Sequence, residues 1–231
     1  MGSSRLPKKT LADVAGKPLL ERVLRQISES EFLDEIVVAT SNKKEDDAIE
    51  ELCKNINFNC FRGSTNDVLM RYIGAARSWD ADIVVRLTGD CPLHSSDTID
   101  EVVCAFLNKE ADYACNTNPY TRPEGQDVEV FYFDQLLRAE KNATAAFDRE
   151  HVTPWIKRQN DISILNFLHT ETGDSILRMS VDYYDDLDFV RCVWEQLKKT
   201  TKNTYSYGDI MTAIKRSNAR HGQSIINEGY Y

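Results

Sequence analysis

The sequence predicts an α/β fold in which helices cover both faces of a mixed, mainly parallel sheet. Over residues 18–109, apolar residues spaced i, i+3, i+4, i+7 alternate with short runs rich in β-branched residues. Strand–helix–strand order at this spacing implies right-handed crossovers between parallel strands. The length of 231 residues fits one large domain. We therefore expect three layers in a single domain spanning 1–231.

The expected helices each carry one apolar stripe. In the first of them, Leu20, Val23, Leu24 and Ile27 lie on one face. A proline inside the sixth should kink or break it. The expected helices are 18–30, 43–56, 66–79, 95–109, 134–142, 146–159, 185–200 and 206–219.

The expected strands lie between these helices, and their pattern changes near residue 117. Residues 126–133 alternate apolar and polar side chains, as a half-buried strand does. The expected strands are 34–41, 58–63, 83–88, 126–133, 161–170 and 175–182.

Composition and charge limit the kinds of binding partner and the cellular compartment that we expect for the chain. The formal net charge is −9, which argues against a nucleic-acid-binding protein. No apolar run approaches the ~20 residues that span a bilayer, and the first residues lack the apolar region of a signal peptide. The six cysteines show no C-x-x-C spacing and the four histidines form no ligand-like pair. We expect a cytoplasmic protein without disulfides, zinc or a membrane segment.

A carboxylate follows each of two expected strands. Strand 83–88 ends at Gly89-Asp90-Cys91-Pro92, and strand 175–182 ends at Asp182. Ligands of open α/β sheets bind beyond the carboxyl ends of the strands, and an unpaired buried charge is costly. Two such carboxylates could share Mg²⁺, which prefers one or two carboxylates together with phosphate oxygens and water. An equally good interpretation is that Asp90 only caps a turn or the next helix.

The first residues combine small side chains with positive charge. Gly2, Ser3 and Ser4 leave backbone N–H groups free, and Arg5 and Lys9 add charge, which is typical of a loop that binds a triphosphate. The loop is not the G-x-x-x-x-G-K-[ST] pattern. The same residues also fit a solvated basic terminus or a remnant of an expression vector.

Seven sequence blocks in one order carry a resemblance to a known family. They are "MGSSRLPKKTL…AGKPLLERVL", "DEIVVATS", "FRGSTNDVLMRY", "VVRLTGDCPL", "GQDVEVF", "DREHVTPWI" and "VDYYDDLDFVR". Together they resemble the cytidylyltransferases of the spore-coat-polysaccharide type, which are similar to CMP-sialic acid and CMP-Kdo synthetases. The resemblance implies a Rossmann-like nucleotidyltransferase fold, related to that of A-type glycosyltransferases. It also implies a Mg²⁺-dependent reaction of CTP with a sugar, giving a CMP-sugar and pyrophosphate.

The resemblance also assigns roles by position. Arg5 and Lys9 match the family's R-L-P-x-K loop and should contact the CTP phosphates, while Asp90 and Asp182 should bind Mg²⁺. Together these are the expected catalytic residues. The expected nucleotide-binding residues are Gly2, Ser3, Ser4, Arg5, Lys9, Arg71, Thr88 and Gly89. The expected sugar-side residues are Asp127, Glu129, Arg149 and His151. His151 is also a candidate general base, but a lone histidine is more often structural.

The same resemblance implies an arrangement of halves and an assembly. Residues 1–117 would form the nucleotide-binding half, and 118–200 the sugar-binding half with a possible dimer contact. A homodimer is the family's usual state.

The chain departs from the family in several places. The family has a strand before M-G-S-S-R-L-P, often ending in Q-A-R, whereas this chain begins at that methionine. The start is misassigned, the chain is trimmed, or the sheet lacks its first central strand. Lys8 stands where the family usually has glycine, Met70 where it has an acid, and Tyr184 where it has proline.

Two other functions fit parts of the sequence. An A-type glycosyltransferase would need a D-x-D near a strand end, but Asp186-Leu187-Asp188 falls inside expected helix 185–200. An inactive nucleotide-binding homologue fits a missing first strand, but does not explain why Arg5, Lys9, Asp90 and Asp182 are all present.

Overall fold

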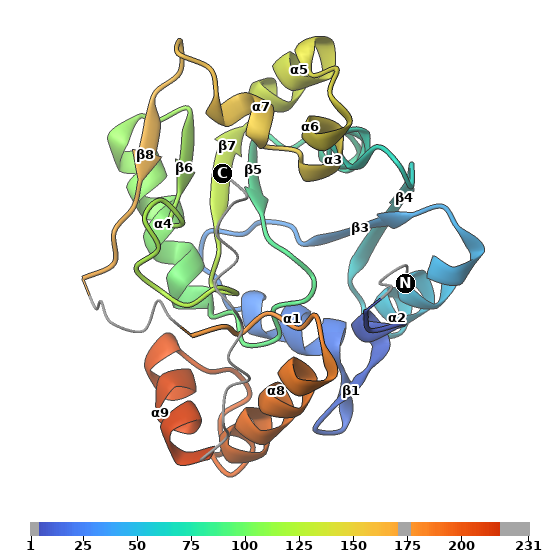
Figure 1. Ribbon diagram of the computed structural model, residues 1–231, viewed down its shortest axis with the longest axis vertical. Coiled ribbons are helices and arrows are strands. Elements are labelled where there is room, and N and C mark those ends of the chain that lie inside the picture. The colour runs from blue at the N-terminus through green and yellow to red at the C-terminus, as the bar shows by residue number, and fades with distance from the viewer. Residues whose placement is uncertain (1–4, 171–176, 218–231) are drawn as a thin grey trace.

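The computed structural model describes residues 5–170 and 177–217 (Figure 1). Its helices are α1 Leu19–Ile27, α2 Asp47–Asn55, α3 Val68–Ser78, α4 Ser96–Lys109, α5 Phe133–Asn142, α6 Ala146–His151, α7 Pro154–Lys157, α8 Tyr184–Leu197 and α9 Tyr207–Ser217. Its strands are β1 Asp13–Val14, β2 Lys17–Pro18, β3 Val37–Ser41, β4 Asn59–Gly63, β5 Ile83–Arg86, β6 Tyr113–Cys115, β7 Glu129–Tyr132 and β8 Ile164–Asn166. Two 3₁₀ turns, Lys9–Leu11 and Lys44–Asp46, complete the described elements.

The main sheet is mixed and falls into two parts. β3 pairs with β4 in parallel, and the second part has the order β5-β7-β6-β8. In that part β7 is antiparallel to both neighbours, while β8 is parallel to β6. Within the described ranges no ladder joins β3 to β5. The expected mixed α/β fold is confirmed, with its ladder interrupted between these two strands.

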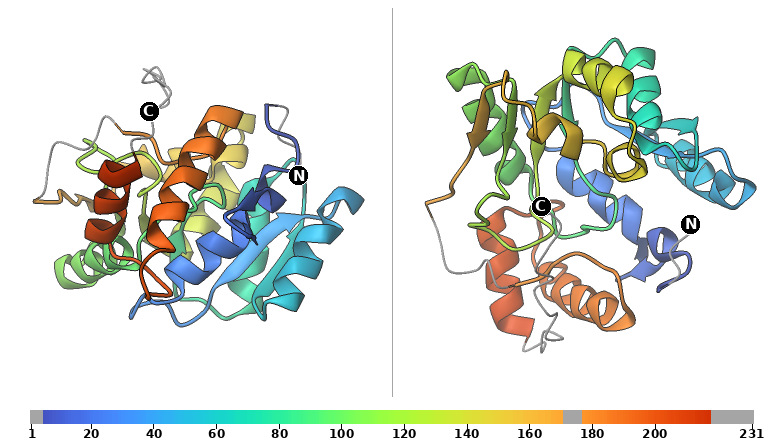
Figure 2. Two further views of the ribbon diagram at one scale, coloured as in Figure 1. Left: turned by 90° about the horizontal axis from the view of Figure 1, so that it is seen from below. Right: turned by 45° about the horizontal axis from the view of Figure 1, so that its top comes forward.

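Alternation along the strands builds the three layers. Ala114 and Val130 point into a core formed with α1, α4, α8 and α9. Their neighbours Tyr113 and Phe131 point to the opposite face, into a core formed with α3, α5 and α7. A smaller cluster packs α1 and α2 against β3 and β4. Figures 1 and 2 show α8 and α9 together at one end and α5 to α7 at the other.

The expected strand 175–182 is wrong for the part that the structure describes. Over 177–182 only Arg178 forms an isolated bridge, with Glu124. The Met179 N–H donates to Glu124 O at 2.7 Å, but the Val181 N–H donates to Asp90 O at 2.9 Å. The N–H groups of these two alternate residues therefore bond to two different loops. For this reason the segment joins no continuous ladder.

The expected break at Pro154 is confirmed. Helix 146–159 becomes α6 and α7, separated by Val152 and Thr153, and Pro154 is the first residue of α7. The expected strand 161–170 shortens to Ile164–Asn166. None of the helices in the described part of the chain is long and apolar enough to cross a membrane.

Candidate active site

Three loops from distant parts of the sequence meet beyond the end of β5. The loop after β5 carries Asp90, whose carbonyl accepts the Val181 N–H. The loop before β7 carries Glu124, whose carbonyl accepts the Met179 N–H. Segment 177–182 is thus bonded through alternate N–H groups along one edge, first to the Glu124 loop and then to the Asp90 loop. The expected meeting of Asp90 with Asp182 follows from these two backbone bonds.

Lys9 joins the two carboxylates. Its Nζ donates to Asp90 Oδ2 at 2.7 Å, to Asp182 Oδ1 at 2.9 Å and to Val181 O at 2.8 Å. Lys9 opens a 3₁₀ turn whose preceding residue, Lys8, has φ 59°. Glycine adopts that conformation most readily, which explains the glycine that the resemblance places at this position.

Asp182 is held by two further cations. Arg5 Nη2 lies 3.0 Å from its Oδ1, and Arg178 Nη2 donates to its Oδ2. Partial burial opposes ionisation, but the hydrogen bond and charge of Lys9, with the charges of Arg178 and Arg5, lower the pKa of Asp182. The carboxylate is therefore ionised at neutral pH.

Sequence reasoning missed Arg178. Its Nε donates to Ser180 Oγ at 2.9 Å and lies 3.2 Å from Glu124 Oε1, so it is tied both to its own segment and to the Glu124 loop. A signal existed, because Arg178, Ser180 and Asp182 alternate and so share one side of an extended chain.

The donor set fits a divalent cation. Asp90 and Asp182 already share one cationic group, the Lys9 ammonium, so they lie close enough to share a metal ion. Over the described ranges, no group of three or more His, Cys, Asp or Glu side chains gathers as a metal centre. Two carboxylates completed by phosphate oxygens and water match the preference of Mg²⁺.

The residues before Asp90 leave space beside the backbone. A Cβ built on Gly89 would meet only Leu20 Cδ1, at 3.7 Å, so internal packing does not require glycine there. Thr88 Oγ1 lies 3.1 Å from Cys91 Sγ. Gly2, Ser3 and Ser4 lie outside the described residues.

Arg71 has no anionic partner among the residues that the structure describes. It lies on α3 against Gly63, where an added Cβ would come within 2.6 Å of its Cγ. Its Nε is buried and forms no hydrogen bond with any residue that the structure describes. A buried arginine nitrogen without a hydrogen-bond partner is better explained by a role in binding an anionic ligand than by a structural ion pair.

Asp127 has an unusual environment. Burial, followed by the charge of Glu124, raises the pKa of Asp127 to about 7, despite the Gly125 N–H at 3.3 Å from Oδ1. After burial, the charges of Asp90 and Asp127 both contribute to the raised pKa of the Cys91 thiol. Because Glu129 pairs with Arg86 at the end of β5, Asp127 lies at the same end of the sheet as Asp90.

Glu129 is enclosed by internal donors. It is 6% exposed and accepts from Arg86 Nη1, from Tyr113 OH at 2.5 Å and from Thr153 Oγ1 at 2.8 Å. Burial opposes ionisation, but the charges of Arg86 and Lys157 outweigh it and lower the pKa of Glu129. The structure places this expected sugar-side residue in a buried ionic network, where internal donors already bind its carboxylate oxygens.

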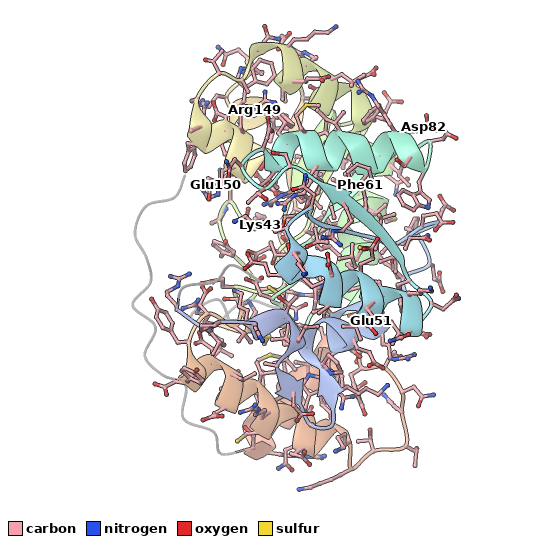
Figure 3. The ribbon with its side chains drawn as sticks, turned by 90° about the vertical axis from the view of Figure 1, so that its right-hand side faces the viewer. Lys43, Glu51, Phe61, Asp82, Arg149 and Glu150 are labelled. Carbon is pink, nitrogen blue, oxygen red and sulfur yellow. The ribbon has the colours of Figure 1, made fainter. Side chains whose placement is uncertain are left out.

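Arg149 and His151 lie on α6, away from the carboxylate pair. Arg149 donates through Nε and Nη2 to Asp67 Oδ2, at 2.8 and 2.5 Å, and Asp67 caps the start of α3. Figure 3 shows Arg149 beside that helix. His151 is exposed, with its ring centroid 4.4 Å from that of Phe147. No contact found in the described chain links either side chain to Asp90 or Asp182.

Helices on both faces of a mixed sheet, with two carboxylates and a lysine beyond β5, define a nucleotidyltransferase-like site. Residues 1–205 match the model of the family described as Cytidylyltransferase, and the chain belongs to this family.

The chain is also similar to several individual proteins. The uncharacterized protein MJ1063 of Methanocaldococcus jannaschii is 44% identical over 155 residues, covering 67% of this chain and 63% of that protein. The spore coat polysaccharide biosynthesis protein SpsF of Bacillus subtilis is 27% identical over 94% of this chain and 91% of its own. A 3-deoxy-manno-octulosonate cytidylyltransferase of Chlorobium phaeovibrioides is 33% identical, covering 72% and 66%. The chain thus spans less than two thirds of the length of some relatives that it matches.

Among solved structures, a cytidylyltransferase from Leptospira borgpetersenii serovar Hardjo-bovis superposes with a TM-score of 0.89. The two chains are 30% identical, and the match covers 97% of this chain and 94% of that one.

We expect Glu129→Gln to lower the free energy of unfolding by about 3 kcal/mol, because it leaves the Arg86 charge buried without its partner. Urea unfolding at pH 7 measures this change. Glu124→Gln is the control, since its carboxylate is half exposed and should cost about 1 kcal/mol or less. An unchanged stability with a raised KM for the sugar would instead make Glu129 a substrate contact.

Gly125→Ala should disrupt the junction that carries Asp182. Gly125 has φ 100°, and an added Cβ would lie 2.9 Å from Ser180 N and 3.0 Å from Met179 C. Gly16→Ala is the matched control, because Gly16 has φ 89° but nothing within 4 Å of the added atom. We expect a loss of about 1 kcal/mol at Gly16 from backbone strain and about 3 kcal/mol at Gly125. Thermal melting measures both losses of stability. Equal losses in the two variants would show that the structure around Gly125 accommodates the added Cβ without further cost.

Proposed function

We propose that the chain transfers a cytidylyl group from CTP to a sugar acid, giving a CMP-sugar and pyrophosphate for surface polysaccharide or glycan biosynthesis. The observation that carries the proposal is the convergence of Lys9, Asp90 and Asp182 on one point in a member of the cytidylyltransferase family. A sugar acid is favoured because one relative acts on 3-deoxy-manno-octulosonate, as its name states.

The reaction needs positioning and neutralisation of charge more than covalent chemistry. A sugar hydroxyl forms a bond to the α-phosphorus of CTP while the bond from that phosphorus to pyrophosphate breaks. Arg5 and Lys9 would bind the triphosphate, and Arg71 would supply a further positive charge on the nucleotide side. Asp90 and Asp182 would hold Mg²⁺, which when bound neutralises charge on the phosphate oxygens.

Asp127 is the carboxylate best suited to accept the proton of the attacking hydroxyl. Its pKa of about 7 lies near the working pH, where a general base is most effective. His151 is less suitable, because it is exposed at the end of α6, where its ring packs against that of Phe147.

A glycosyltransferase is less well supported. Asp186 accepts the backbone N–H groups of Asp182 and Tyr183 at 2.9 Å, and so caps α8. Asp188 pairs with Arg191 at 3.0 Å on the same helix. Neither carboxylate is arranged as a D-x-D metal motif after a strand.

We also propose a homodimer in the cytoplasm. The six cysteines are all unpaired, which supports a reducing compartment. The dimer rests on the family resemblance, and the mass of the purified chain in solution tests it.

A pyrophosphate-release assay tests the reaction. With Mg²⁺, CTP and a panel of sugar acids including 3-deoxy-manno-octulosonate, we expect turnover that ATP, GTP and UTP do not support. Asp90→Asn and Asp182→Asn should each lower turnover by about 100-fold or more, and the double variant little further, because the two act as one unit. No release with any sugar by a chain that binds CTP would favour an inactive homologue, and simple additivity would favour the capping interpretation of Asp90.

The same assay should show an ionisation near neutral pH. Because the base acts when ionised, kcat/KM should rise with pH through about 7 and then level. Asp127→Asn should remove this rise and lower kcat by about 100-fold or more. A profile that is flat between mildly acidic and mildly alkaline pH in the wild-type chain would exclude Asp127 as the base.

A further inference from the structure

The position between the two carboxylates is occupied by a side chain of the protein itself. The Lys9 ammonium has three protons, and three oxygens accept them at 2.7, 2.8 and 2.9 Å. Two of these oxygens belong to Asp90 and Asp182, the residues that would hold the metal. The Lys9 side chain is only 17% exposed, so this contact is part of the packed structure.

A divalent cation cannot share this position with the ammonium. Both groups would lie within hydrogen-bonding or coordination distance of the same oxygens, where like charges repel strongly. Asp182 is also neutralised by Arg5 at 3.0 Å and by Arg178. Metal binding therefore requires that Lys9 leave its carboxylates, and Lys9 needs another anion to contact when it does.

A triphosphate supplies that anion and also the missing metal ligands. No third acidic, histidine or cysteine ligand joins Asp90 and Asp182 in the described part of the chain. Phosphate oxygens can accept the hydrogen bonds that Lys9 and Arg5 now make to carboxylates. They can also complete the coordination of Mg²⁺, which usually binds through one or two carboxylates plus substrate phosphates.

We propose that Lys9 acts as a lock on the metal position, so that the protein binds a divalent cation well only together with a nucleoside triphosphate. This rests on the proposed function only for the identity of the triphosphate. Lys9 has two roles: it excludes free metal from the empty enzyme, and it binds phosphate in the loaded one. By linkage, the metal and the nucleotide each raise the affinity for the other.

Arg178 keeps Asp182 in place during the exchange. Its guanidinium contacts Asp182 Oδ2 and is fixed by Ser180 and Glu124, so it has less freedom to leave than Lys9. Arg178 is therefore a positioning residue, whereas Lys9 is the group that moves.

The test measures Mn²⁺ binding to the full chain without nucleotide or sugar, by the loss of the free Mn²⁺ EPR signal. Lys9→Met keeps the length of the side chain and removes its charge. We expect this variant to bind Mn²⁺ at least about tenfold more tightly than wild type. Such a factor is within the usual range of coupling between two binding events. Lys8→Met is the matched control, because Lys8 is exposed and contacts neither carboxylate. Its Mn²⁺ affinity should equal that of wild type.

A second measurement follows the melting temperature. Mn²⁺ alone should stabilise Lys9→Met more than wild type, whereas in wild type Mn²⁺ and CTP together should exceed the sum of their separate shifts. Lys9→Gln repeats the test if Lys9→Met does not fold. If neither folds, micromolar Mn²⁺ binding by the nucleotide-free wild-type chain overturns the proposal, and weak binding supports it.

The outcomes separate this proposal from the proposed function. Equal or weaker Mn²⁺ binding by the Lys9 variants overturns the lock, whatever the pyrophosphate assay shows. The expected Mn²⁺ result without turnover of CTP overturns the proposed reaction but leaves the lock in place, because no nucleotide enters the Mn²⁺ titration.

Discussion

The candidate site depends on the backbone hydrogen bonds that attach segment 177–182 to two loops. Met179 and Val181 donate alternate N–H groups to Glu124 and Asp90, so the segment connects the loop before β7 to the loop after β5. Gly125 permits this approach, because its missing side chain leaves room for the Ser180 backbone. Asp90 and Asp182 lie more than ninety positions apart in the sequence, and these bonds bring them together around Lys9.

Once the carboxylates are together, cations must accompany them. Two partly buried acids sharing a site repel each other unless opposite charges lie close by. Lys9, Arg5 and Arg178 supply those charges. A ligand-free site made in this way is stable but already neutralised. Its ligands must therefore replace internal ion pairs, which favours ligands carrying both anionic oxygens and a metal.

Much of this arrangement could be predicted from the sequence, and the failures have physical causes. The alternation of strand and helix patterns over 18–109 predicted the three layers. The structure shows them in the side chains of β6 and β7, where Tyr113 and Phe131 face one core and Ala114 and Val130 face the other. The pairing of Asp90 with Asp182 followed from the rule that ligands bind at strand ends, even though the second strand does not form. Arg178 was missed although its alternation with Asp182 indicated that the two share one side of the chain. The internal role of Glu129 was missed because the partner of a buried charge is set by tertiary packing, which local patterns do not encode.

Asp127 and Glu129 show how far environment decides the use of a residue. They stand two positions apart in one sequence block, and the resemblance assigned both to the sugar. Burial raises the pKa of Asp127 to about 7, and the negative charge of Glu124 adds to this effect. Burial also acts on Glu129, but Arg86 and Lys157 outweigh it and lower the pKa of that carboxyl. Two carboxylates whose environments separate their pKa values in this way are suited to different tasks. Glu129 remains a fixed charge that holds Arg86, whereas Asp127, at the same end of the sheet as Asp90, can take up and release a proton near neutral pH.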